Sequence, residues 1–248
     1  MIAIRSLKKR LGGKQVLDGV DLEIANGQTV VVVGPSGTGK SVLLKHIVGL
    51  MQADAGSIEV DGEEIVGKKE HELNQVRRKF GMLFQGAALF DSMTVGENVA
   101  LPLREHTALD EAEIARRVQE RLDWVGLSEV EAVKPASLSW GMRKRVGLAR
   151  AIVMDPAFIL YDEPTTGLDP IMADVIDRLI RSLQQRMGVT SIAVTHDMGS
   201  AFKIGDRIAM MLDGRIVFNG TPAEMQASAD PVVRQFIEGS SEGPIQPV

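Results

Sequence analysis

The sequence predicts an α/β protein with a largely parallel sheet in its core, a strand-rich N-terminal part and an inserted helical lobe. Three features lead to this prediction. A β-branched strand pattern near the N-terminus passes through a glycine-rich segment into a helix pattern. Residues from about 91 to 155 keep helical spacing. Strand and helix patterns then alternate to about residue 220, which is typical of a sheet covered by helices.

Residues 1–60 are expected to form mainly strands and turns. Thr29–Val33 is a β-branched run typical of a fully buried strand. Asp61-Gly62 lies in the middle of Ser57–Ile65, and this combination indicates a hairpin. Apolar residues at helical spacing over Lys40–Met51 predict a helix directly after the glycine-rich segment.

The inserted helical region begins near Asp91 and ends near Asp155. Within it, Asp110 and Glu113 resemble a helix-capping pair. An apolar stripe follows, made of Ile114, Val118 and Leu122. The strands predicted after this region are Phe158–Tyr161, Ser191–Val194 and Ile208–Leu212. The helices predicted there are Ile171–Met187, Ala223–Gln226 and Pro231–Ile237, before a tail rich in Gly, Ser and Pro.

The composition is that of an ordinary globular protein, since 44% of the 248 residues are hydrophobic and 25% are charged. The net charge of −5 argues against a protein that mainly coats nucleic acid. A sequence without cysteine has no disulfides and no thiolate metal sites. No apolar stretch approaches the roughly 18 residues of a spanning helix, and the N-terminal residues lack the apolar core of a signal peptide. A soluble or peripheral protein is therefore expected.

The glycine-rich segment matches the pattern G-x-x-x-x-G-K-[ST] of a phosphate-binding loop. Glycines in such a loop let backbone N–H groups surround phosphate oxygens at the start of a helix, while the lysine adds positive charge and the hydroxyl ligates Mg²⁺. The alternative, a structural glycine turn, is weakened by the buried strand before the segment and the helix after it. The expected nucleotide contacts are Gly34, Pro35, Ser36, Gly37, Thr38, Gly39, Lys40, Ser41 and Val42.

Two carboxylates, Asp162 and Glu163, follow the apolar run Phe158–Tyr161. A buried strand that ends in acids delivers them to the C-terminal edge of a sheet, where phosphates bind. Asp162 is expected to hold Mg²⁺, and Glu163 is expected to orient and partly deprotonate the attacking water. On its own, such a pair is more often an ordinary strand end.

Further motifs follow along the chain, and together with the phosphate loop they resemble the ABC ATPase family, whose signature is LSGGQ. The motifs are Leu83-Phe84-Gln85, Leu138-Ser139-Trp140-Gly141-Met142, Thr166-Gly167-Leu168-Asp169 and Val194-Thr195-His196-Asp197. The resemblance covers nearly the whole chain. It implies a P-loop NTPase fold with a RecA-like mixed sheet core, an N-terminal antiparallel β subdomain and an inserted helical lobe. ATP and Mg²⁺ are the implied cofactors, and ATP hydrolysis coupled to transport is the implied activity.

The resemblance also implies how the chain is divided. A single ABC ATPase domain is expected over residues 1–238. Its core lobe would comprise residues 1–90 and 155–220, and its helical lobe, which carries the signature motif, residues 91–154. A C-terminal extension is expected over residues 221–248.

Roles for single residues follow from the same resemblance. Gln85 is expected to sense Mg²⁺, as a ligand beside Ser41 and Asp162, and to sense the membrane partner. His196 is expected to touch the γ-phosphate, so Gln85 and His196 join Glu163 as catalytic candidates. Taken singly, Gln85 is more often a loop amide and His196 a strand-end histidine.

The expected dimer contacts come from the signature and from Asp169. Ser139, Gly141 and Met142 lie at the start of a helix, whose N–H groups can hold the ATP bound by the opposite subunit. Asp169 is expected to contact the partner subunit across the dimer. Its alternative role is a helix cap before Pro170.

Two positions depart from the family pattern. Trp140 stands where the family usually has glycine, a residue that permits close approach of backbone to phosphate. Leu11 stands near the point where members carry an aromatic residue that stacks on adenine, and leucine offers apolar contact without stacking. Both changes concern the nucleotide contacts.

Within the family, the segment Phe84–Val95 and the ending Asp230–Gly239 resemble the ATPases of Mla/Mce lipid transporters. This implies a homodimer that works with an integral membrane permease and an Mce-type substrate-binding protein at the cytoplasmic face of a bacterial inner membrane. A STAS-domain partner on the helical lobe is an open alternative. The apolar loop Ala87–Met93 suits a surface that docks the permease, or else a buried loop inside the domain.

Three other classes of function are alternatives to the transport ATPase. A basic cluster of Arg143, Lys144, Arg145 and Arg150 is expected to be a solvated face or to form intersubunit pairs rather than to bind nucleic acid. A soluble ABC protein acting on DNA or ribosomes usually joins two cassettes or inserts a long coiled coil. A scaffold that binds ATP without turnover is the minor alternative. Trp140 and Leu11 leave it open, whereas it is opposed by the intact Lys40, Asp162, Glu163 and His196.

Overall fold

The computed structural model of the protein describes residues 1–246, which divide into two compact units. The first unit comprises Met1–Arg77 and the chain from Thr190 onward, and the second comprises Arg78–Val189. The lobe boundaries expected from the sequence stay a prediction, and residues 247–248 of the expected extension lie outside the described residues. Within residues 1–246, no helix is both long and apolar enough to span a membrane.

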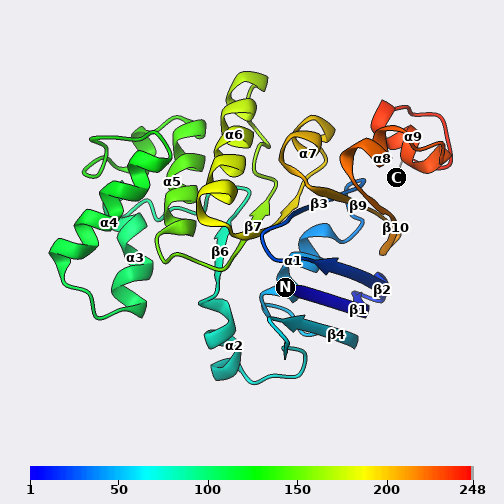
Figure 1. Cartoon of the computed structure of the whole chain (residues 1–248), viewed down its shortest axis with the longest axis horizontal. Coiled ribbons are helices and arrows are strands. Elements are labelled where there is room, and N and C mark those ends of the chain that lie inside the picture. Colours follow the sequence, from blue (N-terminus) through cyan, green and yellow to red (C-terminus); the bar gives the residue numbers. More distant parts are fainter. Residues whose placement is uncertain (247–248) are drawn as a thin grey trace. The chain divides into compact units, whose positions relative to one another are not determined.

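The first unit contains an antiparallel sheet in the order β2-β1-β4-β5. Its strands, drawn in blue to cyan in Figure 1, are β1 (Ile2–Leu11), β2 (Lys14–Ile24), β4 (Ala55–Val60) and β5 (Glu63–Glu64). β4 and β5 form the predicted hairpin, and both turn residues have positive φ, 52° at Asp61 and 77° at Gly62. A turn whose two central residues have positive φ twists in the same sense as the strands that flank it. The hairpin prediction is therefore confirmed.

The first unit also contains three strands that pair in parallel. β3 (Thr29–Val33) is fully buried and pairs in parallel with β8 (Thr190–Val194) and with β9 (Arg207–Leu212). β10 (Arg215–Gly220) is antiparallel to β9. The combination of an antiparallel sheet with a mixed, largely parallel one confirms the predicted α/β class.

Helix α1 follows β3 but ends earlier than expected. It spans Lys40–Ile47 because Gly49 adopts a left-handed φ of 65°, which ends a helix. The remaining helices of the first unit are α2 (Glu70–Arg77), α7 (Met198–Ile204), α8 (Pro222–Gln226) and α9 (Pro231–Glu238). The last two confirm the short C-terminal helices. Helix α2 was not predicted; it is mostly polar, and its buried residues are Leu73 and Val76.

The second unit is the helix-rich part of the chain. Its strands β6 (Phe80–Leu83) and β7 (Phe158–Asp162) pair in parallel, with the Phe80 and Phe158 rings stacked 5.0 Å apart. Helix α5 packs against α3, α4 and β6 (Figure 1). The apolar stripe predicted on α4 is buried at all three positions. The helices are α3 (Val95–His106), α4 (Glu111–Trp124), the 3-10 turn Pro135–Ser137, α5 (Trp140–Ile152) and α6 (Pro170–Met187).

Gly81 on β6 permits the close approach of the strand to the end of α5. A Cβ atom there would lie 2.0 Å from the carbonyl oxygen of Ala151. We expect Gly81→Ala to lower the free energy of unfolding by about 2 kcal/mol, since backbone atoms on both sides would have to move. Gly86→Ala is the matched control, because nothing lies within 4 Å of the added Cβ. Equal urea midpoints for the two variants would contradict this packing.

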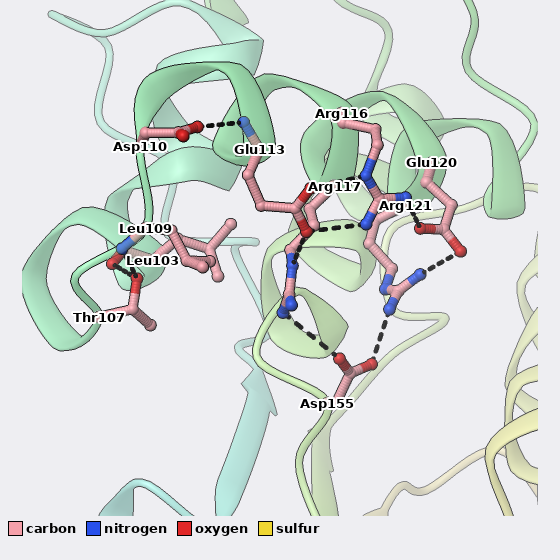
Figure 2. Close-up of polar contacts among 10 residues, drawn as sticks. All are labelled: Leu103, Thr107, Leu109, Asp110, Glu113, Arg116, Arg117, Glu120, Arg121 and Asp155. Atoms are coloured by element: carbon pink, nitrogen blue, oxygen red, sulfur yellow. Dashed lines mark hydrogen bonds and ion pairs between the residues drawn. The ribbon is translucent and has the colours of Figure 1, made fainter.

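A charge network covers α4 (Figure 2). Asp110 caps the helix by accepting from the Glu113 backbone N–H at 2.8 Å, as predicted. The Glu113 side chain does not complete a capping box; its carboxylate accepts from Arg116 Nε at 2.7 Å and from Arg117 Nε at 2.8 Å. The Glu113 side chain therefore points along the helix toward Arg116 and Arg117, and not back toward the backbone N–H of Asp110.

The two arginines lower the pKa of Glu113 from 4.5 to about 2. A carboxylate with a lowered pKa stabilises the folded state above its unfolded pKa, and that contribution is lost as the pH falls from about 4.5 to about 2. We expect Glu113→Gln to flatten the dependence of the unfolding midpoint on pH in this window, by a small amount because the site is exposed. Glu105→Gln, an exposed change on α3, is the control; identical acid profiles for the wild type and Glu113→Gln would contradict the pairing.

Candidate functional site

The first unit carries the phosphate-loop segment between β3 and α1. Three of its glycines have positive φ: 149° at Gly34, 81° at Gly37 and 100° at Gly39. A Cβ at Gly34 would lie 2.2 Å from the Met211 carbonyl oxygen, and one at Gly39 would lie 2.8 Å from that of Val16. Conformation and space both favour glycine at positions 34 and 39, whereas at position 37 the conformation alone favours it. The loop ends directly at the N-terminus of α1.

Lys40 lies inside this loop rather than in solvent. Its side chain is only 8% exposed, and Nζ donates to the carbonyl oxygens of Gly34 at 2.8 Å and Pro35 at 3.0 Å. Thr38 Oγ1 also donates to Pro35, at 2.9 Å. A loop of backbone N–H groups with a buried ammonium is the arrangement that receives phosphate oxygens.

The other predicted residues of the first unit lie at element ends. Ser41 is exposed on the first turn of α1, next to the half-buried Val42. His196 is exposed after β8, and the following Asp197 caps α7 by accepting from Gly199 N at 2.8 Å. Leu11 ends β1 with 38% of its surface exposed. Each of these side chains is accessible to a ligand.

The second unit carries the two carboxylates at the end of β7. Asp162 is the last strand residue, and Glu163 follows it with a φ of 49°, a left-handed conformation that is uncommon outside glycine. Both side chains are half-buried. The Glu163 carboxylate accepts from Thr166 Oγ1 at 2.9 Å. A strained backbone that aims a carboxylate is frequent at functional sites.

The signature residues begin α5, also in the second unit. Ser139 caps the helix, with its Oγ accepting from Met142 N at 3.2 Å. Trp140 is 39% exposed, and its Nε1 donates to the Thr166 carbonyl oxygen at 3.2 Å. Gly141 is buried, and an added Cβ would lie 2.6 Å from the Met172 Cε atom. The sequence marked Trp140 as a departure but did not indicate its contact with the loop after Glu163.

Asp169 occupies the capping position that was its alternative role. Its Oδ1 accepts from Ile171 N and Met172 N, both at 3.0 Å, and starts α6. The residue is exposed, so the cap leaves it accessible to a partner subunit. Gln85 is likewise exposed, after β6, and its carbonyl oxygen accepts from Lys144 Nζ at 2.5 Å.

The basic cluster on α5 is not simply a solvated face, because Lys144 is buried and Arg143, Arg145 and Arg150 are half-buried. The alternative expectation of intersubunit pairs stays a prediction. Lys144 is fully buried, and burial lowers its pKa to about 8 although Glu163 and Asp162 raise it. The four cations of this cluster donate to backbone carbonyl oxygens of neighbouring segments. The arginine contacts are Arg143 with Ala136 O, Arg145 with Gly126 O, and Arg150 with Ala87 O and Ala88 O.

The predicted Mg²⁺ ligands provide oxygen donors only. Ser41 supplies a hydroxyl in the first unit, and Gln85 and Asp162 supply an amide and a carboxylate in the second. Mg²⁺ prefers oxygen ligands and usually keeps several waters beside one or two carboxylates. This donor set therefore fits Mg²⁺ by its chemistry.

Comparisons with known proteins agree with the motifs. The ABC transporter family model matches residues 17–166. The probable ribonucleotide transport ATP-binding protein mkl of Mycobacterium leprae is 43% identical over 98% of this chain and 70% of its own length. The intermembrane phospholipid transport system ATP-binding protein MlaF of Haemophilus influenzae is 40% identical over 99% of this chain and 93% of its own.

A solved structure supports the same assignment. A dimeric ATP-binding cassette in a post-hydrolysis state, bound to ADP and Pi, superposes with a TM-score of 0.83 at 33% identity, covering 90% of this chain and 99% of that one. The match covers most of the chain and is therefore not limited to the motifs. By its phosphate loop, its carboxylate pair and these relatives, the chain belongs to the ABC transporter family, as one of its ATP-binding ATPase subunits.

Proposed function

We propose that this ATPase subunit powers the movement of phospholipid, or another hydrophobic molecule, between bacterial membranes together with an Mla/Mce-type permease. The observation that carries the proposal is the extent of its similarity to MlaF, which spans 99% of this chain and 93% of the relative. The Mycobacterium leprae relative named for ribonucleotide transport is slightly more identical, at 43%, but this chain spans 70% of its length. Ribonucleotide transport is therefore the second candidate.

In the proposed mechanism, ATP binds to the loop Gly34–Ser41, with Mg²⁺ held by Ser41, Asp162 and Gln85. Mg²⁺ neutralises phosphate charge when it is bound. Glu163 orients the attacking water and accepts a proton from it, and its Thr166 contact directs the carboxylate. His196 touches the γ-phosphate.

The nucleotide also joins two copies of the chain. We propose that Ser139, Gly141 and Met142 hold the ATP bound by the opposite subunit, and that Asp169 contacts that subunit. The exposure of Ser139 and Asp169 supports these roles. We propose that each subunit is divided into a core lobe of residues 1–90 and 155–220, a helical lobe of residues 91–154, and a C-terminal extension of residues 221–248.

The membrane partner is proposed to dock on the loop after Gln85. Phe84 is 38% exposed and Phe90 is 51% exposed, whereas Ala87 between them is buried. Two exposed aromatic rings beside a nucleotide-sensing residue suit a surface that transmits nucleotide state to a permease. An Mce-type protein, and a STAS-domain partner as an open alternative, complete the proposed assembly at the cytoplasmic face of the inner membrane.

The experiment is reconstitution of the chain with its co-purified membrane partners in proteoliposomes. ATP-dependent transfer of a fluorescent phospholipid to acceptor vesicles, abolished by Glu163→Gln, is the expected result. Uptake of a radiolabelled ribonucleotide without lipid transfer would replace the first candidate by the second. ATP binding without phosphate release in any setting would reject the transport motor.

A further inference from the structure

The first two turns of α5 hold the segment that follows the catalytic carboxylate at two points. Trp140 Nε1 donates to the carbonyl oxygen of Thr166 at 3.2 Å. Lys144, one turn further along the same helix face, donates from Nζ to the carbonyl oxygen of Glu163 at 3.0 Å. The two side chains also approach each other, with the Lys144 ammonium 5.8 Å from the Trp140 ring centroid. Both ends of Glu163–Thr166 are thus attached to one helix.

Thr166 connects this attachment to the carboxylate itself. Its carbonyl oxygen receives the indole N–H, its hydroxyl donates to Glu163 Oε2 at 2.9 Å, and its backbone N–H donates to the Glu163 carbonyl oxygen at 3.4 Å. Glu163 meanwhile has a φ of 49°. A conformation of this kind persists only when its surroundings hold it, and the contacts of Thr166 and Lys144 are such surroundings.

We propose that Trp140 and Lys144 are positioning residues that set the orientation of the Glu163 carboxylate, Trp140 through Thr166 and Lys144 through the Glu163 backbone. This inference rests on the proposed role of Glu163 in hydrolysis. Lys144 Nζ also donates to the Gln85 carbonyl oxygen at 2.5 Å, so one ammonium ties the segment that carries Gln85 to the segment that carries Glu163.

A purely structural role explains these side chains less well. Lys144 is fully buried, and a buried ammonium is costly unless specific acceptors require it. Trp140 is 39% exposed, so burial of its ring gives limited stability, and its specific contact is the indole N–H. Gly167 has a φ of 83°, and a Cβ there would lie 2.9 Å from Trp140 Nε1. The loop is therefore shaped to receive the indole that replaces the family's usual glycine.

The test separates the chemical step from nucleotide binding. Trp140→Phe removes the N–H and keeps a ring, Thr166→Val removes the hydroxyl, and Lys144→Met removes the charge. We expect kcat for phosphate release to fall about 3- to 10-fold for the first two and about 10- to 100-fold for Lys144→Met. The Kd of a fluorescent ATP analogue should change less than about twofold. Lys144→Arg should recover most of the loss.

Matched controls exist in the same unit. Trp124→Phe changes the other tryptophan, on α4, and Lys134→Met removes a lysine that donates to the Ser92 carbonyl oxygen at 2.7 Å, away from Glu163. Both should keep the wild-type kcat. Thermal midpoints identify any variant that fails to fold. If Lys144→Met fails to fold, the test rests on Trp140→Phe, which keeps an aromatic ring, and on Thr166→Val, which nearly keeps the volume of the side chain.

A double-mutant cycle distinguishes this inference from the proposed function. In single-turnover hydrolysis, Trp140→Phe should add less than about twofold to the loss caused by Glu163→Gln, because both act on one carboxylate. The inference would be overturned if Trp140→Phe lowered the rate by the same factor in the wild type and in Glu163→Gln. It would also be overturned if kcat were unchanged in Trp140→Phe, Thr166→Val and Lys144→Met. In both cases the proposed role of Glu163 would stand. A Glu163→Gln variant with wild-type turnover would instead reject the proposed role of Glu163 first.

Discussion

Glu163→Gln is expected to reduce steady-state ATP hydrolysis by about 10²- to 10⁴-fold, the range that general-base catalysis contributes. The amide keeps the size of the side chain and can still accept from Thr166 Oγ1, which now lies 2.9 Å from Glu163 Oε2. It cannot take a proton from water. Phosphate release by the purified chain, with and without its membrane partners, measures this effect.

ATP binding by this variant should remain within about threefold of the wild type, because the lost interaction belongs to the transition state. Glu129→Gln, an exposed change elsewhere in the second unit, is the control and should leave turnover intact. Should Glu163→Gln bind and hydrolyse ATP as the wild type does, another group must activate the water.

Lys40→Met is expected to weaken ATP binding about 10- to 100-fold, since hydrogen bonds from a charged donor contribute about 1.5–3 kcal/mol. The ammonium lies in the loop, 2.8 Å from the Gly34 carbonyl oxygen and 3.0 Å from that of Pro35, so it is already placed beside the phosphate position before the nucleotide arrives. Titration with a fluorescent ATP analogue measures the change in Kd.

Lys45→Met is the matched control, because Lys45 is an exposed lysine on the same helix α1. Its affinity should equal that of the wild type, and the thermal midpoints of both variants should show that the fold is kept. Wild-type affinity in Lys40→Met would mean that the loop binds its ligand through backbone N–H groups alone. The two predictions thus assign different steps to the two residues: Lys40 contributes to ATP binding, and Glu163 contributes to the hydrolysis step.

The local features of the fold could be predicted from the sequence because they depend on residues that are close together in the chain. The β-branched run of β3, the glycines that lead into α1 and the Asp61-Gly62 hairpin each have the predicted structure. The end of β7 at Asp162 also follows from one apolar run. Helix ends were less exact, since α1 ends at Ile47 where a glycine with positive φ follows.

Some elements carry too little signal to be foreseen. β6 has only four residues, which are too few for an alternating pattern to stand out in the sequence, although half-buried and buried positions alternate along it. β10 alternates half-buried and exposed positions beside β9, and it exists because that neighbour supplies its hydrogen bonds. The side chain of Glu113 was expected to face the helix start, but two arginines one turn away attract it instead.

The sequence by itself determined the family, the phosphate loop and the pair of carboxylates, because contiguous residues form these motifs. Only the tertiary structure decided what Lys144 does. Its acceptors, the carbonyl oxygens of Gln85 and Glu163, lie 59 and 19 positions away in the chain. A charge pattern shows that a helix is basic, but which buried carbonyl groups need a donor depends on how distant segments pack.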